Sequence, residues 1–196
     1  MVELKTPGEI EAMRAAGAVV AEALATVRAH AGIGVCLKDL DDVAAEVLRA
    51  AGATSPFLGY HPDWAPSPFP GVVCASVGDA VVHGIPGSYR LRDGDLVSID
   101  CGAVLDGWCG DAAVSFTVGT ADPEDLALIA AAEDALARGV AAAVPGNRLG
   151  DIGAAIGGYV RSRGYGLLAD HGGHGIGRRR HEDPHVPNEG RVGRGL

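Results

Sequence analysis

Residues 95–118 read DLVSIDCGAVLDGWCGDAAVSFTV. Apolar and polar side chains alternate on both sides of Asp106-Gly107, and an Asp-Gly pair between two such runs is the strongest short-range signal for a β-hairpin with a two-residue turn. The turn sets the pairing of the two strands, because each step away from it brings the next two residues opposite each other. It predicts that Gly102 lies opposite Asp111.

This pairing predicts a pair of carboxylates on one face of the hairpin. Side chains alternate along a strand, so Asp100 shares a face with Gly102 and lies diagonal to Asp111, at roughly 7–8 Å between Cα atoms. Two solvated aspartates are the simpler alternative. The neighbours Val97 and Ile99 indicate buried strands, where an unpaired charge is costly. The two carboxylates are therefore expected to share a proton or to bind divalent cations.

Four cysteines occur, at Cys36, Cys74, Cys101 and Cys109, and none forms a C-x-x-C motif. The spacing excludes a redox motif of that kind and a zinc ribbon, and free thiols in a reducing cytosol are the expectation. The alternation that pairs the aspartates puts Cys109 on their face and Cys101 on the other. These two are not expected to form a disulfide, and a packing role is expected for Cys109.

Helix and strand signals flank the hairpin. A capping box at Thr6, Pro7 and Glu9 predicts the start of a first helix, which ends near Gly32. The other predicted elements are a helix from Lys38 to Ala51, strands Val72–Val77 and Ala80–Val82, helices from Pro123 to about Val144 and from Leu149 to Arg163, and Gly-rich chain over 164–177. The order helix, helix, strand thus begins a second time after residue 121.

Composition and charge exclude several classes of protein. A net charge of −9 disfavours nucleic acid as a general partner, because phosphate binding needs cations. The first five residues contain charges and no apolar core of a signal peptide follows them. The Ala-rich stretch from Ala127 to Val144 carries too many charges to span a bilayer. With 47% hydrophobic residues the chain has enough apolar side chains for a real core.

The histidines and glycines near the end of the chain suggest chemistry. His174 lies between glycines, which leave room for a close approach to its ring, and imidazole is a common ligand of transition metals. A nucleotide loop is rejected, because residues 173–177 read GHGIG and lack the G-x-G-x-x-G spacing. His30 is expected to be an ordinary surface or core residue, and Arg178–Arg180 to be a solvated charge run.

A Pro-rich connection spans residues 53–70. Its prolines exclude a regular helix, and four aromatic residues lie among them: Phe57, Tyr60, Trp64 and Phe69. The connection is either an ordinary packed loop or one wall of a pocket, since rigid scaffolds often carry their sites on loops. The residues by themselves leave both interpretations open.

Several motifs occur together in a fixed order. They are Val82-His83-Gly84-Ile85-Pro86, the segment 95–100, Gly107-x-x-Gly110-Asp111, the segment 173–177 and His181-Glu182-Asp183-Pro184. In this order, and with eleven positions between the aspartates, they closely resemble the type I methionine aminopeptidases. The resemblance extends from Thr6-Pro7 over nearly the whole chain.

The resemblance implies an α+β pita-bread fold, with a central antiparallel sheet and helices on its outer face. It implies two divalent metal ions (Co, Mn, Fe or Zn) held by Asp100, Asp111 and His174. It assigns His83 and His181 to catalysis and to contact with the peptide. Tyr60, Phe57 and Phe69 would line the pocket for the methionine side chain.

The resemblance also implies a reaction and a setting. The family removes the N-terminal methionine of new proteins when the second residue is small. The expected partner is therefore a peptide or nascent-chain N-terminus, with the ribosome as a candidate partner. We expect a cytoplasmic monomer without a membrane or a specific nucleic-acid partner, formed by residues 1–196 as a single catalytic domain.

The sequence departs from the family at its end and in one loop. The family's two glutamate ligands follow the His-Glu-x-Pro segment on later strands, and Glu182 and Glu189 come too early to match them. We therefore expect that the chain lacks C-terminal strands, binds metal weakly and turns over little or not at all. An insertion around 63–68 also lengthens the predicted pocket loop.

Two alternatives remain from the sequence. Loss of the glutamates would suit a non-catalytic pita-bread protein that binds a partner, although such a protein has no chemical reason to keep the aspartates and histidines. The second alternative is an X-Pro peptidase of the same fold. That group usually has an additional N-terminal domain, for which no room is expected before Thr6.

Overall fold

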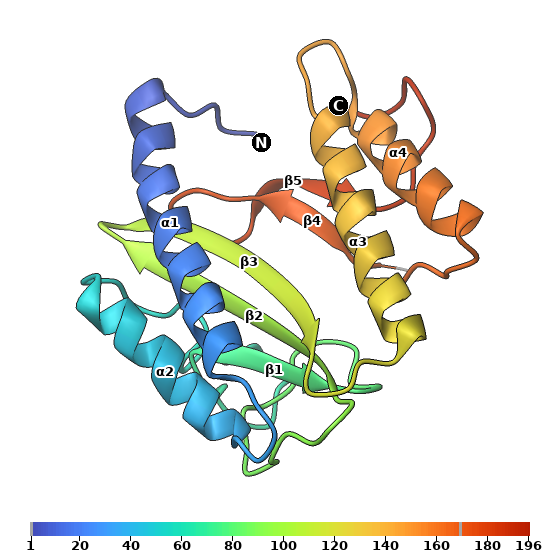
Figure 1. The fold of residues 1–196 in the computed structure, drawn as a ribbon. Coiled ribbons are helices and arrows are strands. Elements are labelled where there is room, and N and C mark those ends of the chain that lie inside the picture. The colour runs from blue at the N-terminus through green and yellow to red at the C-terminus, as the bar shows by residue number, and fades with distance from the viewer. Residues whose placement is uncertain (1, 169) are drawn as a thin grey trace. The chain divides into compact units, whose positions relative to one another are not determined.

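The computed structural model describes residues 2–168 and 170–196 (Figure 1). The elements in chain order are α1 (Pro7–His30), α2 (Leu37–Ala50), β1 (Val73–Val77), β2 (Leu96–Leu105), β3 (Trp108–Thr117), α3 (Pro123–Ala142), α4 (Leu149–Ser162), β4 (Gly172–Gly175) and β5 (Glu182–Pro187). The chain divides into two compact units. The first unit comprises Leu4–Asp125 and Ile176–Arg180, and the second comprises Met1–Glu3, Leu126–Gly175 and His181–Leu196.

The first helix begins as predicted. The Thr6 hydroxyl accepts a hydrogen bond from the Glu9 N–H at 3.4 Å, and the Glu9 carboxylate accepts one from the Thr6 N–H at 2.8 Å. Pro7 occupies the first turn, where its missing N–H costs nothing. These contacts complete the capping box and fix where α1 starts.

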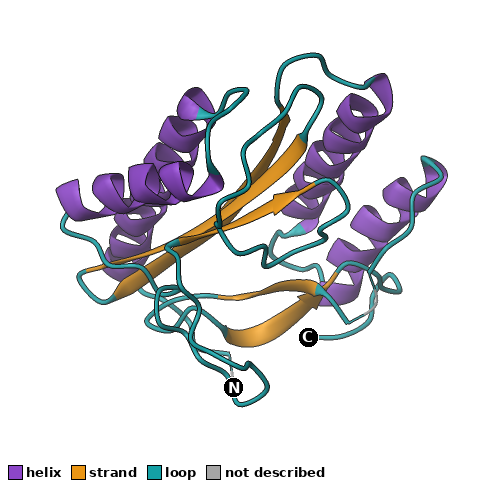
Figure 2. Cartoon of the chain, turned by 90° about the horizontal axis from the view of Figure 1, so that it is seen from below, coloured by secondary structure: helices purple, strands orange, loops and turns teal. Residues whose placement is uncertain are grey.

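The β2–β3 hairpin also has the predicted register. Asp106 and Gly107 both have positive φ angles, 50° and 77°, as a two-residue type I′ turn requires. Gly102 therefore lies opposite Asp111. β1 pairs antiparallel with the other edge of β2, which gives the sheet the order β1-β2-β3. Both views show β2 and β3 as long neighbouring strands (Figures 1 and 2).

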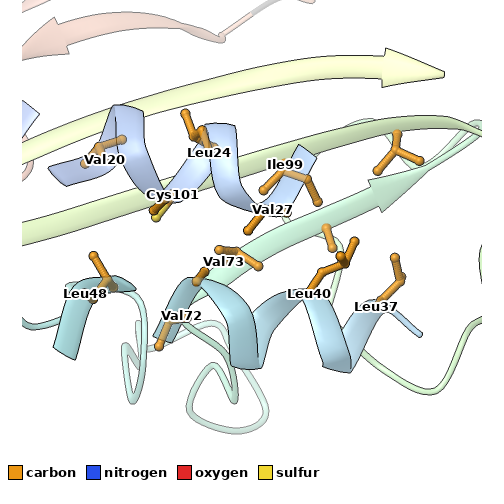
Figure 3. Packing of buried hydrophobic residues seen from close by; sticks show 14 of the residues in the cluster. Val20, Leu24, Val27, Leu37, Leu40, Leu48, Val72, Val73, Ile99 and Cys101 are labelled. Carbon is orange, nitrogen blue, oxygen red and sulfur yellow. The ribbon is translucent and has the colours of Figure 1, made fainter. Parts of the chain in front are cut away.

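The hydrophobic core lies between this sheet and helices α1 and α2. The side chains that pack there come from every second residue of β2, including Ile99 and Cys101, which are fully buried (Figure 3). Val20 and Leu24 of α1 pack against them. Because neighbouring side chains of a strand point to opposite faces, Asp100 is left on the face away from these helices.

The predicted strand Ala80–Val82 is wrong. This segment is irregular chain that follows a turn at Gly78-Asp79, with Val81 62% exposed. The returning chain meets β1 closely at Gly84, whose carbonyl accepts a hydrogen bond from the Ala75 N–H at 2.8 Å. His83, immediately before it, has a φ of 59°, which no strand can accommodate. The alternation of apolar residues therefore did not produce a paired strand.

The second unit contains α4, most of α3 and a short hairpin. Glycines on α4 allow close packing against the end of the chain: the Gly150 N–H donates to the Arg194 carbonyl at 2.9 Å. The chain predicted only as Gly-rich over 164–177 ends in β4, which pairs antiparallel with β5. Within the described residues, no helix is both long enough and apolar enough to cross a membrane.

Candidate metal centre

Asp100 on β2 and Asp111 on β3 form the carboxylate pair that the sequence predicts. Asp111 lies opposite Gly102, so it is diagonal to Asp100 on the face away from α1 and α2. The two carboxyl groups hydrogen-bond to each other. The absence of a side chain at Gly102 matters here, because an added Cβ would lie 2.8 Å from Cε1 of Phe57.

Burial and mutual repulsion make this pair costly to ionise. Burial, which contributes most, the nearby charge of Asp111 and the shared hydrogen bond together raise the pKa of Asp100 to about 7. The positive charge of Arg180 acts in the opposite direction. Two adjacent carboxylates that retain a proton near neutral pH are suited to a divalent cation, which would replace the proton and neutralise both charges.

Cys74 is a neighbour that the sequence did not reveal. It lies opposite Asp100 in the β1–β2 pairing and so shares its face of the sheet. Burial, followed by the charge of Asp100, raises the pKa of the Cys74 thiol to about 12, which leaves it protonated and unreactive. The alternation of side chains along β2 shows which residues share a face. It does not show which other strand pairs with β2, so Cys74 could not be predicted as a neighbour.

The four cysteines are buried thiols. As expected, Cys101 points to the helix side and carries a free thiol. Cys109 is packed: its N–H donates to the Gly177 carbonyl at 2.8 Å and its Sγ lies 3.7 Å from the Arg178 carbonyl. The segment Ile176–Arg180 is thereby attached to β3 within the first unit.

His83 belongs to the first unit and follows the irregular return from β1. Its position is fixed by the next residue, since the Gly84 N–H donates to the Ser76 hydroxyl at 3.1 Å. A Cβ at Gly84 would lie only 2.2 Å from the Ala75 carbonyl oxygen, so glycine is required where the chain crosses β1. His83 itself is exposed.

His174 and His181 belong to the second unit, where their ring centroids are 4.5 Å apart in an edge-to-face arrangement. Nδ1 of His174 lies 2.9 Å from the Gly175 carbonyl oxygen. A carbonyl oxygen only accepts, so Nδ1 must carry the proton and the neutral ring has its lone pair on Nε2. Such a hydrogen bond fixes the tautomer and orients a metal-binding imidazole.

The glycines beside His174 allow close packing of the backbone more than they leave space around the imidazole ring. A Cβ at Gly175 would lie 2.1 Å from the Asp183 carbonyl oxygen, at the point where the β4–β5 register shifts. The expectation that they leave room around the ring is therefore incomplete, because Gly175 is needed for the close approach of β5.

The predicted pocket residues lie on one loop of the first unit. The Phe69 N–H donates to the Tyr60 carbonyl and the Gly59 N–H donates to the Phe69 carbonyl, both at 2.8 Å, which brings the two ends of the loop together. Phe57 is buried against Gly102. The insertion between these residues projects outward, with Trp64 79% exposed.

The arginine run is not simply solvated, which corrects the sequence interpretation. The guanidinium of Arg178 lies 4.2 Å from the ring centroid of Trp108, and that of Arg180 lies 4.8 and 4.7 Å from the centroids of Phe57 and Tyr60. Arginine stacks readily on aromatic faces. The run of arginines could not predict this stacking, because the aromatic rings come from distant parts of the chain.

Comparison with known proteins identifies the family. The model of metallopeptidase family M24 matches residues 11–195. The chain belongs to metallopeptidase family M24. It is 50% identical to methionine aminopeptidase 1 of Mycobacterium tuberculosis and 44% identical to the methionine aminopeptidase of Clostridium acetobutylicum. It aligns over its whole length and spans 74% and 76% of those proteins.

Solved structures of M24 proteins give the fold. The methionine aminopeptidase of Rickettsia prowazekii superposes with a TM-score of 0.94 at 36% identity, covering all of this chain and 77% of that one. The prolidase of Pyrococcus furiosus superposes with a TM-score of 0.82 at 23% identity, over 96% of this chain and 53% of that one, which shows the fold alone. The chain has the α+β pita-bread fold that the sequence predicted.

Membership of M24 implies divalent metal cofactors, and the residues of this chain fit them. The first unit supplies two hydrogen-bonded carboxylates in a partly buried setting, and the second supplies an imidazole with an oriented tautomer. These are the oxygen and nitrogen donors that first-row divalent ions bind. Glu189, which the sequence analysis judged too early to be a ligand, hydrogen-bonds to Arg161.

Proposed function

We propose that this chain is a metal-dependent aminopeptidase that releases the N-terminal methionine of peptides whose second residue is small. The observation that carries the proposal is the buried, hydrogen-bonded pair of Asp100 and Asp111. Relatives that are 39–50% identical along the chain are methionine aminopeptidases, which supports the same substrate here. The X-Pro peptidase alternative is supported by superposed structures at 22–24% identity, which show the fold alone.

We propose Asp100, Asp111 and His174 as ligands of two divalent ions, which would be Co, Mn, Fe or Zn. When bound, such ions lower the pKa of a water molecule and polarise the scissile carbonyl. The carboxylates would hold them by replacing the shared proton with cationic charge. His174 would bind through Nε2, because its Nδ1 is engaged by the Gly175 carbonyl.

The two remaining histidines would act on the peptide. Each imidazole can donate a hydrogen bond to the oxygen that gains negative charge as the carbonyl is attacked, which is worth about a hundredfold in rate. We assign this role to His83 and His181. The fixed backbone at Gly84 supports it for His83, because a donor contributes most when it is already in position.

Tyr60, Phe57 and Phe69 are proposed to receive the methionine side chain. Support comes from the position of Phe57, which packs on Gly102, the residue opposite Asp111 and on the same face as Asp100. Methionine makes favourable contacts with aromatic rings. A side chain held there would place the adjacent peptide bond beside the proposed metals.

The remaining assignments follow from this reaction. The partner is a peptide or nascent-chain N-terminus, and the ribosome is a candidate partner because N-termini emerge there. We propose a cytoplasmic monomer in which residues 1–196 work as one catalytic domain.

The test is release of free methionine from Met-Ala-Ser in the presence of Mn²⁺ or Co²⁺. It is run on this chain and on a version extended by the following in-frame residues, with Asp100→Asn as the control that keeps shape and removes charge. Metal-dependent release that Asp100→Asn abolishes is the result expected of the extended chain, with little or no release by this chain alone. Failure of the extended chain to release methionine would contradict the proposal, and cleavage of X-Pro peptides instead would move it to that alternative.

A further inference from the structure

Arg180 lies against two of the proposed pocket residues. Its guanidinium carbon is 4.8 Å from the ring centroid of Phe57 and 4.7 Å from that of Tyr60. Phe57 is 3% exposed and Tyr60 46% exposed, so the arginine contacts one ring that is buried and one that reaches the surface. All three belong to the first unit.

This cluster adjoins the carboxylates. Phe57 packs on Gly102, which lies opposite Asp111 and next but one to Asp100 on the same face of the sheet. Arg180 therefore lies against the aromatic residues proposed to receive the first side chain of a bound peptide.

Stacking uses the flat face of a guanidinium and leaves its N–H groups in the plane around the edge. Within residues 2–168 and 170–196, Arg180 has no hydrogen bond or ion pair with the protein. It is only partly exposed. The pocket thus has an aromatic wall and, beside it, a set of hydrogen-bond donors that a ligand can use.

Arg178 provides a comparison within the same run. It also stacks on an aromatic ring, that of Trp108, at 4.2 Å. It contacts the hairpin turn, since a Cβ at Gly107 would lie 3.1 Å from its Nη1, and no proposed pocket residue is among its ring contacts. Arg178 thus has the same charge as Arg180 and also stacks on an aromatic ring, but it lies outside the proposed pocket.

We propose that Arg180 is a specificity-determining residue that gives the pocket for the first side chain a polar wall. This rests on the proposed function. The pocket would accept methionine on its aromatic faces and would also accept side chains of the same length that end in a hydrogen-bond acceptor. Methionine sulfoxide is the closest such side chain, because its sulfoxide oxygen is a far better acceptor than a thioether sulfur.

The experiment measures binding of L-methionine and L-methionine sulfoxide by calorimetry to the Mn²⁺-loaded chain. The variants are Arg180→Leu, which keeps an apolar stem without donors, and Arg178→Leu as the matched control. Arg180→Leu is expected to weaken sulfoxide binding relative to methionine binding by about tenfold, the scale of one charge-assisted hydrogen bond. Arg178→Leu is expected to leave this ratio unchanged. A ratio within one protein is unaffected by differences in metal occupancy.

An unchanged ratio in Arg180→Leu, or an equal change in Arg178→Leu, would overturn the role of Arg180. If neither amino acid binds the unmodified chain, the pocket and the role of Arg180 are both wrong. The same variants are assayed for kcat/KM on Met-Ala-Ser and its sulfoxide. A shifted binding ratio without release of methionine would support the pocket and contradict the proposed catalysis, so the two claims fail separately.

Discussion

Asp100 and Asp111 hydrogen-bond to each other although Asp111 lies opposite Gly102 and not opposite Asp100. The pairing is diagonal, across neighbouring strands of one hairpin. Gly102, the residue opposite Asp111, carries no side chain, and Phe57 packs onto it. The pair is thus set by a turn at Asp106-Gly107, whose two residues fix the register of both strands.

Stability of the metal-free chain is expected to fall as pH rises from about 4 to about 7. The pKa of Asp100 is raised from 3.8 to about 7 in the folded protein, so within that window the folded state holds a proton that the unfolded state has lost. The contribution is fully present below pH 3.8 and is lost as pH passes about 7. Urea unfolding at several pH values measures it.

The matched variant for this prediction is Asp100→Asn, which cannot titrate. It should show a smaller decrease in stability over the same window than the unmodified chain. Equal slopes for the two proteins would mean that Asp100 is not the group responsible.

Asp41 is expected to be the most sensitive acidic residue for folding. It is 8% exposed, and its Oδ1 accepts hydrogen bonds from the N–H groups of Val72 and Val73 at 2.7 and 3.0 Å. Asp41→Ala leaves two buried donors unsatisfied and should cost about 2–4 kcal/mol in the free energy of unfolding. Asp41→Asn keeps an acceptor oxygen and should cost less. Chemical denaturation measures both.

The neighbouring Asp42 provides the control for Asp41. It forms an exposed ion pair with Lys38 at 3.1 Å. Surface pairs of this kind contribute little, so Asp42→Ala should cost below about 1 kcal/mol. A cost as large as that of Asp41→Ala would show that the buried hydrogen bonds are not what matters.

Gly84→Ala is expected to disturb the site through the backbone. The new methyl would lie 2.2 Å from the Ala75 carbonyl oxygen, so the chain around His83 must shift. A misplaced catalytic group costs about a hundredfold in rate for a displacement near 1 Å, and kcat/KM should fall by that order. Gly87→Ala serves as control, since its nearest contact would be an ordinary 3.8 Å. Similar losses in both variants would argue against this role of Gly84.

Local signals in the sequence were sufficient for the hairpin and the helices. The Asp106-Gly107 turn determined the register, and the capping box at Thr6 determined where α1 begins. Both features depend on residues close together in the chain. The diagonal placement of Asp100 and Asp111 followed from the turn alone, which is why this half of the candidate site could be predicted in detail.

Features that depend on distant parts of the chain could not be predicted in this way. Cys74 pairs with Asp100, and Arg180 stacks on Phe57. In both cases the two segments are far apart in the sequence, and neither the alternation of side chains nor the charge of one segment predicts which other segment it contacts. The false strand at Ala80–Val82 has the same cause. Alternating apolar residues suggested a strand there. The chain instead approaches β1 closely at Gly84, and residues 80–82 form no strand beside it.

The proposed function requires a cation that is bound by Asp100, Asp111 and His174. Anomalous diffraction from a Mn²⁺-soaked crystal of the chain tests this most directly. We expect a peak about 2.0–2.3 Å from carboxylate oxygens of both aspartates and from Nε2 of His174, absent in Asp111→Asn. A map in which Mn²⁺ binds elsewhere, or in which no peak lies between these side chains, would contradict it.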